Sequence, residues 1–128
     1  MARFLSPEWL AEVEAVARRD ERVRHSASMV DLTVRHVVRG APQGDIAYNV
    51  HIADGTVQVE PGGTDGDVEL TQDYGTAVAI SQGAVTPAAA FAAGRLKLGG
   101  RVDVLVRTGD ALAALTDVFA QVRETTEY

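Results

Sequence analysis

The chain has 128 residues, a formal net charge of -6 at pH 7 and no cysteine. We predict one domain over residues 1–128, because a chain of this length buries roughly two-thirds of its unfolded surface and 46% of its residues are hydrophobic. The acidic balance argues against a nucleic-acid partner, which needs a basic surface. The lack of cysteine excludes disulfides, thiolate catalysis and cysteine zinc sites.

The N-terminal segment predicts an amphipathic helix. Ser6 is suited to cap an early amide and Pro7 to occupy the first helical position, and Trp9 and Val13 begin an apolar stripe at helical spacing. The helix is expected to end in the charged run 18–22. The segment carries no secretory signal, and no run of about 18 apolar residues occurs in the sequence. We therefore expect a cytoplasmic protein with at most transient membrane contact.

The stretch after this helix predicts a sheet, because its apolar side chains recur with a period of two. Segments 30–38 and 46–52 alternate, Asp54-Gly55 is a strong hairpin signal into 57–59, and a short strand around 68–70 follows. The pattern indicates an antiparallel meander of about four strands with one apolar face. Other elements must cover that face.

The next segment predicts the cover. Asp73 or Thr71 can cap a helix that ends at Gly83. Thr86-Pro87 then opens a short Ala-rich helix, which Gly94 can end in the left-handed conformation that favours glycine.

Small side chains in this cover leave room beside the sheet. Together with the larger apolar residues Ile80 and Phe91, these small side chains predict the wall of an apolar pocket. Residues 95–98 alternate as a fifth strand. Ligand pockets are mostly apolar with few polar groups, so the lack of reactive chemistry is compatible with binding. On the pattern alone, ordinary close packing of an alanine helix against the sheet is the simpler interpretation.

The C-terminal part predicts one further helix. Residues 101–107 fit a strand or a helix equally well, whereas Leu112, Leu115 and Phe119 form a clear helical stripe. The tail 124–128 is expected to fray.

The sequence offers little catalytic chemistry. None of the three histidines has a metal-ligand partner at a recognised spacing, the acidic turn 62–67 lacks the spacing of an EF-hand, and no nucleophile elbow is present. We therefore predict no metal, no cofactor and no catalytic residue. His36 points with Val34 and Val38 toward the covered face, where it could orient a ligand hydroxyl or act as a base. Such a histidine is more often part of the core.

The order of residues through the cover resembles the sterol carrier protein type 2 family. The matching positions run from a glycine through a Thr-Pro helix start and an Ala-Phe pair to a Gly-basic-Leu-basic-Leu passage: Gly83, Thr86, Pro87, Ala90, Phe91, Gly94, Arg95, Leu96, Lys97, Leu98 and Gly100. The similarity covers most of the chain, roughly residues 9–119. It implies an α+β fold in which a five-stranded, mainly antiparallel sheet is covered on one face by helices, with a hydrophobic tunnel between them.

The resemblance also implies a function. It implies non-enzymatic binding, and transfer or presentation, of a small hydrophobic ligand such as a sterol, a fatty acid or a fatty acyl-CoA. Carried onto this sequence, and joined by Ile80 from the pocket pattern, the expected ligand-binding residues are Val34, Val50, Ile80, Phe91, Leu96, Leu98, Leu112, Leu115 and Phe119.

Two other functions are left open. A small enzyme resembling ketosteroid isomerases or polyketide cyclases would also place an apolar pocket between a sheet and helices. His36 would then be the base, since Asp31 lies on the opposite strand face. A structural role would instead use an exposed face to join a partner or a second copy, which leaves a homodimer open.

Overall fold

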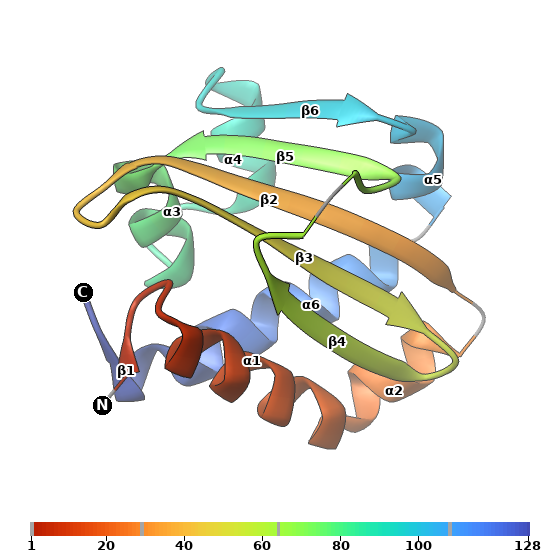
Figure 1. The fold of residues 1–128 in the computed structure, drawn as a ribbon. Coiled ribbons are helices and arrows are strands. Elements are labelled where there is room, and N and C mark those ends of the chain that lie inside the picture. Colours follow the sequence, from red (N-terminus) through yellow and green to blue (C-terminus); the bar gives the residue numbers. More distant parts are fainter. Residues whose placement is uncertain (1, 29, 64, 108) are drawn as a thin grey trace.

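The computed structural model describes residues 2–28, 30–63, 65–107 and 109–128, apart from the side chains at 102, 105, 107 and 109–112. Figure 1 shows the elements, which in chain order are β1 (Ala2–Arg3), α1 (Pro7–Arg19), α2 (Glu21–Ala27), β2 (Asp31–Ala41), β3 (Gly44–Ala53), β4 (Thr56–Pro61), β5 (Val68–Asp73), α3 (Tyr74–Ser81), α4 (Pro87–Ala92), β6 (Leu96–Gly100), α5 (Val102–Arg107), α6 (Gly109–Val122), the 3-10 turn η1 (Arg123–Thr125) and β7 (Thr126–Glu127).

Five strands form the main sheet, in the order β4-β3-β2-β5-β6. All neighbouring pairs are antiparallel except β2 and β5, which are parallel. The prediction of a five-stranded, mainly antiparallel sheet is therefore confirmed, together with its α+β class.

The predicted meander is wrong at its fourth strand, because β5 pairs with β2 and not with β4. The loop before β5 crosses the sheet and is fixed there by Asp67. Its N–H donates to the carbonyl of Thr33 at 2.8 Å, and its carboxylate accepts from the Thr33 N–H at 2.9 Å. Alternation shows which face a strand buries, but it carries no information about which neighbour the strand pairs with.

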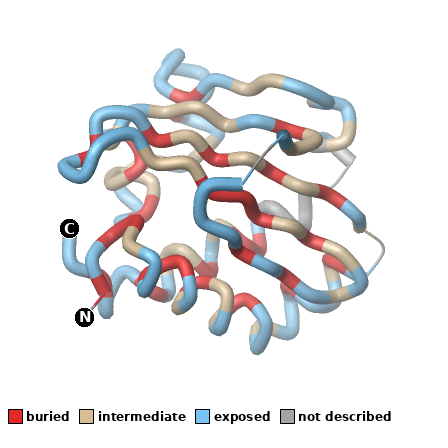
Figure 2. Tube along the Cα trace, in the orientation of Figure 1, coloured by how far each residue is buried: buried red, intermediate tan, exposed pale blue. Residues whose placement is uncertain are grey.

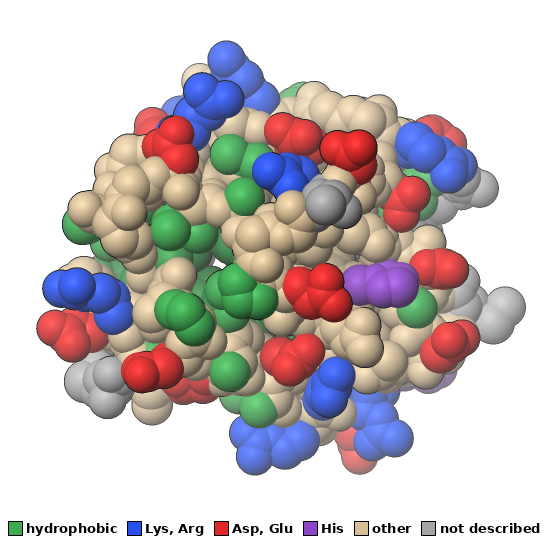
Figure 3. All heavy atoms as spheres, viewed as in Figure 1, with side chains coloured by type: hydrophobic (Ala, Val, Ile, Leu, Met, Phe, Trp, Pro, Cys, Tyr) green, Lys and Arg blue, Asp and Glu red, His purple; other side chains and the backbone are tan. Residues whose placement is uncertain are grey.

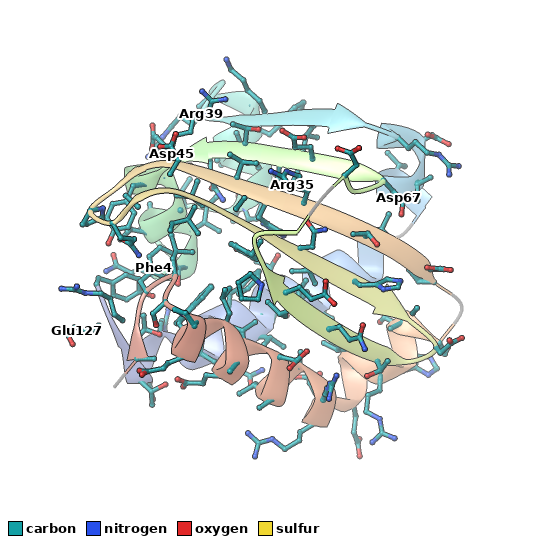
Figure 4. The ribbon with its side chains drawn as sticks, in the orientation of Figure 1. Phe4, Arg35, Arg39, Asp45, Asp67 and Glu127 are labelled. Carbon is teal, nitrogen blue, oxygen red and sulfur yellow. The ribbon has the colours of Figure 1, made fainter. Side chains whose placement is uncertain are left out.

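The sheet has one buried and one exposed face. Leu32, Val34, His36 and Val38 of β2 are buried, whereas the residues between them are partly exposed. Figure 2 shows this alternation along the strands, and Figure 1 shows α3, α4 and α6 behind the sheet, with α1 and α2 below it beside β4. Charged side chains of both signs are spread over the exposed face (Figure 3), with Arg35 of β2 among them (Figure 4).

The predicted start of α1 is confirmed, but a second helix, α2, begins within the charged run where the first was expected to end. Ser6 Oγ accepts a hydrogen bond from the Trp9 N–H at 3.1 Å, as an N-cap does. Asp20 then caps α2 by accepting from the Val23 N–H at 3.1 Å. The charged run is therefore the end of one helix and the start of the next, and the missed signal was Asp20 as an N-cap.

The cover forms as predicted. Asp73, not Thr71, caps α3 by accepting from the Thr76 N–H at 2.7 Å. Gly83 and Gly94 follow α3 and α4 with φ of 78° and 75°, in the region where a side chain is strained.

The C-terminal part resolves one ambiguity and corrects one prediction. Residues 102–107 form a helix, so the strand alternative is wrong. The tail is ordered and not frayed: β7 pairs in parallel with β1, with Thr126 opposite Ala2. The hydroxyl of Tyr128 lies 2.6 Å from Ser81 Oγ on α3. Pairing between the two chain ends is a long-range contact that a local pattern cannot predict.

No helix within the described residues is both long enough and apolar enough to cross a membrane.

Candidate binding site

A cavity of about 330 Å³ lies between the buried face of the sheet and the helices. This volume is at the small end of the range of about 300–1,000 Å³ for ligand pockets. The sheet, α3, α4, α6 and the N-terminal segment all contribute to its wall.

The floor of the cavity is built from two neighbouring rows of residues across the sheet. One row runs over four strands in register and consists of Tyr48, His36, Leu70 and Leu98. The next row adds Gln72 and Leu96, which pair with each other across β5 and β6. Since side chains on one sheet face repeat every second residue, both rows point toward the helices.

The opposite wall comes from the helices, and it brings together residues far apart in the sequence. Apolar residues predicted to bind a ligand lie here: Ile80 of α3, Phe91 of α4, and Leu115 and Phe119 of α6. With the floor residues Leu96 and Leu98, six of the predicted site residues line one cavity. Their role in binding stays a prediction.

Two predicted residues, Val34 and Val50, are placed outside the cavity. Val34 and Val50 pair with each other one row beyond the floor, where both are fully buried in packed core. Both lie on the same sheet face as His36, but they do not line the cavity, because neighbouring core side chains pack against them. Leu112 lies outside the residues whose side chains the structure describes.

The N-terminal segment supplies wall residues that the sequence pattern does not mark as ligand-binding. Trp9 of α1 and Phe4, in the turn between β1 and α1 (Figure 4), both line the cavity, as does Tyr48 of β3. The amphipathic stripe correctly marks Trp9 as inward-facing. No local signal shows that its ring borders a hollow.

Stacked rings give one end of the cavity a fixed shape. His36 lies parallel to Tyr48 with ring centroids 4.7 Å apart, and Trp9 stacks on Phe119 at 5.8 Å. Phe119 also presents its edge to His36 at 6.3 Å. Such packing restricts the rotamers of all four rings, so this end of the site is formed before a ligand binds.

The wall carries no formal charge among the described residues, since Asp, Glu, Lys and Arg are absent from those that line it. Burial lowers the pKa of His36 to about 4, and burial also raises the pKa of Tyr48. Both side chains are therefore neutral near pH 7. A neutral, largely apolar cavity favours an uncharged or hydrocarbon ligand.

Phe91 and Ala88 mark the opening. Both line the cavity, yet Phe91 is 53% exposed and Ala88 is exposed as well. Phe91 therefore contacts both the cavity and solvent. The short helix α4 thus forms the boundary between the cavity and solvent.

The described residues contain no group of three or more potential metal ligands of the kind formed by His, Asp and Glu.

Comparison with known proteins gives a consistent result. Residues 13–112 match the model of the SCP-2 sterol transfer family. A crystal structure of sterol carrier protein 2 is similar, with a TM-score of 0.80 and 20% identity, over 93% of this chain and 98% of the other. No curated protein sequence matches the chain.

Two further solved structures share the fold. A conserved hypothetical protein from Thermus thermophilus, suggested to be a sterol carrier protein, has a TM-score of 0.78 and 20% identity, covering 95% of this chain and 91% of the other. Palmitated SCP2L2 from Aedes aegypti has a TM-score of 0.62 and 22% identity, covering 89% and 94%. At these identities the likeness establishes the fold.

Proposed function

The chain belongs to the SCP-2 sterol transfer family, and on that premise we propose that it binds a lipid in the cavity beneath Phe91 and transfers or presents it unchanged. Sterols, fatty acids and fatty acyl-CoA all remain candidates. The proposal includes a cytoplasmic location and at most transient contact with membranes. The observation that carries it is the uncharged cavity of about 330 Å³ with α4 at its opening.

Desolvation of hydrocarbon supplies the driving force. Burying about 300 Å² of apolar ligand surface contributes roughly 7 kcal/mol before the entropy costs of association. The apolar floor and wall offer the surface for this burial through six residues that we propose as ligand-binding: Ile80, Phe91, Leu96, Leu98, Leu115 and Phe119.

The first test is direct binding. Delipidated protein is incubated separately with a fatty acid, a fatty acyl-CoA and a sterol, and native mass spectrometry then measures the bound mass. We expect a complex of one lipid per protein with at least one class. If every class leaves the protein mass unchanged, the proposed function is wrong.

A matched pair of variants on α4 then locates the site. Ala88 and Ala89 are adjacent and exposed, but only Ala88 is among the residues that line the cavity. Ala88→Phe is expected to obstruct the opening and lower lipid affinity at least tenfold. Ala89→Phe is expected to leave affinity unchanged, and both variants should keep their stability within about 0.5 kcal/mol because the positions are exposed. Equal affinity in the two variants would place binding elsewhere.

An enzyme with His36 as its base is the second candidate, because His36 does line the cavity. Its pKa of about 4 makes it a weak base at neutral pH, since general bases work best with a pKa near the operating pH. Turnover of steroid enones that His36→Ala abolishes would support this candidate. Absence of turnover, or turnover that the variant leaves unchanged, would remove it.

A further inference from the structure

Three side chains of the cavity carry buried polar atoms without a protein partner. Within the described part of the chain, no group hydrogen-bonds to Trp9 Nε1, His36 Nε2 or Gln72 Oε1. All three residues line the cavity, and Trp9 and His36 are only 1% and 7% exposed. We call Trp9, His36 and Gln72 the polar wall.

The three residues of the polar wall lie near one another at the end of the cavity that holds the stacked rings. His36 pairs with Leu70 in the parallel β2–β5 register, so Gln72 is its diagonal neighbour on the same face. Trp9 stacks on the ring of Phe119, whose edge meets His36. The three residues therefore come from two adjacent strands and one helix that meet at the stacked rings.

The chemistry of the three atoms is complementary. The indole N–H of Trp9 only donates a hydrogen bond, and the amide oxygen of Gln72 only accepts one. A neutral imidazole nitrogen donates or accepts according to its tautomer. A ligand group that meets all three must therefore both donate and accept.

A hydroxyl group meets this requirement, whereas an ether, a ketone or an ionised carboxylate does not. An ether or ketone oxygen only accepts, so it leaves the amide oxygen of Gln72 without a donor. A carboxylate is also acceptor-only, and its charge would be buried in a wall that has no Lys or Arg among its described residues.

We propose that the lipid bound in this cavity carries an uncharged hydroxyl group, which the polar wall hydrogen-bonds at the aromatic end. This inference rests on the proposed function and adds the chemical class of the ligand. The three buried atoms of the polar wall have no protein partner among the described residues, so a ligand that packs against them without hydrogen-bonding to them leaves them unsatisfied and loses affinity. Each unmade bond is expected to weaken binding about tenfold to a hundredfold.

The cavity size suggests the probes. At about 30 Å³ for a group the size of a water molecule, 330 Å³ holds roughly eleven heavy atoms. 1-Decanol has this size. 1-Methoxydecane accepts but does not donate a hydrogen bond, and decanoate at pH 8 adds a charge.

Titration calorimetry of the three probes tests the proposal. We expect 1-decanol to bind at least ten times more tightly than 1-methoxydecane or decanoate. Gln72→Leu should weaken the alcohol about tenfold and leave the ether unchanged, because only the alcohol donates to Gln72. His36→Phe should weaken the alcohol as well. Gln58→Leu makes the same substitution as Gln72→Leu on the exposed face of β4 and should change nothing.

The outcomes distinguish failure of the hydroxyl proposal from failure of lipid binding itself. Equal affinity for the alcohol and the ether, or an alcohol affinity that Gln72→Leu leaves unchanged, would overturn the hydroxyl proposal and leave lipid binding intact. If none of the probes binds, and no lipid binds by mass spectrometry, both proposals fail together. Because Gln72 is only partly buried, its variant remains testable even if His36→Phe fails to fold.

Discussion

Acidification from pH 7 to pH 4 should destabilise the protein specifically through His36. The imidazole is buried and neutral in the folded state, where desolvation lowers its pKa from 6.5 to about 4. Between pH 6.5 and pH 4, His36 is protonated in the unfolded chain but stays neutral in the folded protein. The free energy of unfolding therefore falls as the pH drops below 6.5, and the loss is complete below pH 4.

The size of the effect follows from the two pKa values. Their difference of about 2.5 corresponds to about 3 kcal/mol, at 1.36 kcal/mol per pKa unit. This is a large part of the stability of an ordinary domain, which is roughly 5–15 kcal/mol. His36→Phe should remove the effect, because a phenyl ring can keep the stack on Tyr48 without titrating.

Urea unfolding at pH 7, 6, 5 and 4 measures this difference. Carboxylates contribute their own pH dependence, so the quantity of interest is the change between pH 7 and pH 4 in the wild type minus that in His36→Phe. His25→Gln, at an exposed histidine, is the control and should follow the wild type. If the wild type and His36→Phe lose the same free energy, His36 is not held neutral by burial and the description of the cavity is wrong. An NMR titration of the His36 ring proton should give the pKa of about 4 directly.

Three substitutions test other contacts by urea unfolding at pH 7. Leu115→Ala should cost about 2–5 kcal/mol because the side chain is 2% exposed; a cost below about 1 kcal/mol would contradict its burial. Tyr128→Phe removes the hydroxyl 2.6 Å from Ser81 Oγ and should cost about 1 kcal/mol, whereas no change would mean that the tail is not held. Asp73→Ala should cost about 1 kcal/mol through loss of the α3 cap. The hydrogen bond from Thr76 lowers the pKa of Asp73, so the wild-type advantage should persist above pH 3.8 and fade as the pH falls through the lowered pKa; an advantage independent of pH would exclude the carboxylate as the cap.

Local residue types were enough to predict most of the elements. Ser6 and Thr86 each accept the hydrogen bond expected of an N-cap, at 3.1 Å in both cases, and Gly94 takes the left-handed conformation. These are short-range effects, because a cap or a glycine stop depends only on a few neighbouring residues. The parallel β2–β5 pair and the β1–β7 pair involve distant segments, and they were missed for that reason.

The sequence was enough to predict which face of the sheet is buried, but not where on that face a cavity remains. Val34 and His36 are two residues apart on the same face of β2, yet Val34 is in packed core and His36 borders the cavity. The difference depends on which side chains the helices place above each row of the sheet. Trp9 and Tyr48 meet there from segments 39 residues apart in the sequence, with ring centroids 6.3 Å apart, and only the folded structure shows this.

The single tryptophan provides the most direct test of the central claim. Trp9 is the sole tryptophan of the chain and lines the cavity, so a brominated lipid that enters should quench its fluorescence by contact. We expect quenching by a brominated lipid alcohol that saturates at one lipid per protein, that unbrominated 1-decanol reverses and that Ala88→Phe weakens at least tenfold. Trp9 fluorescence that stays unchanged at saturating concentrations of the brominated lipid would contradict the account.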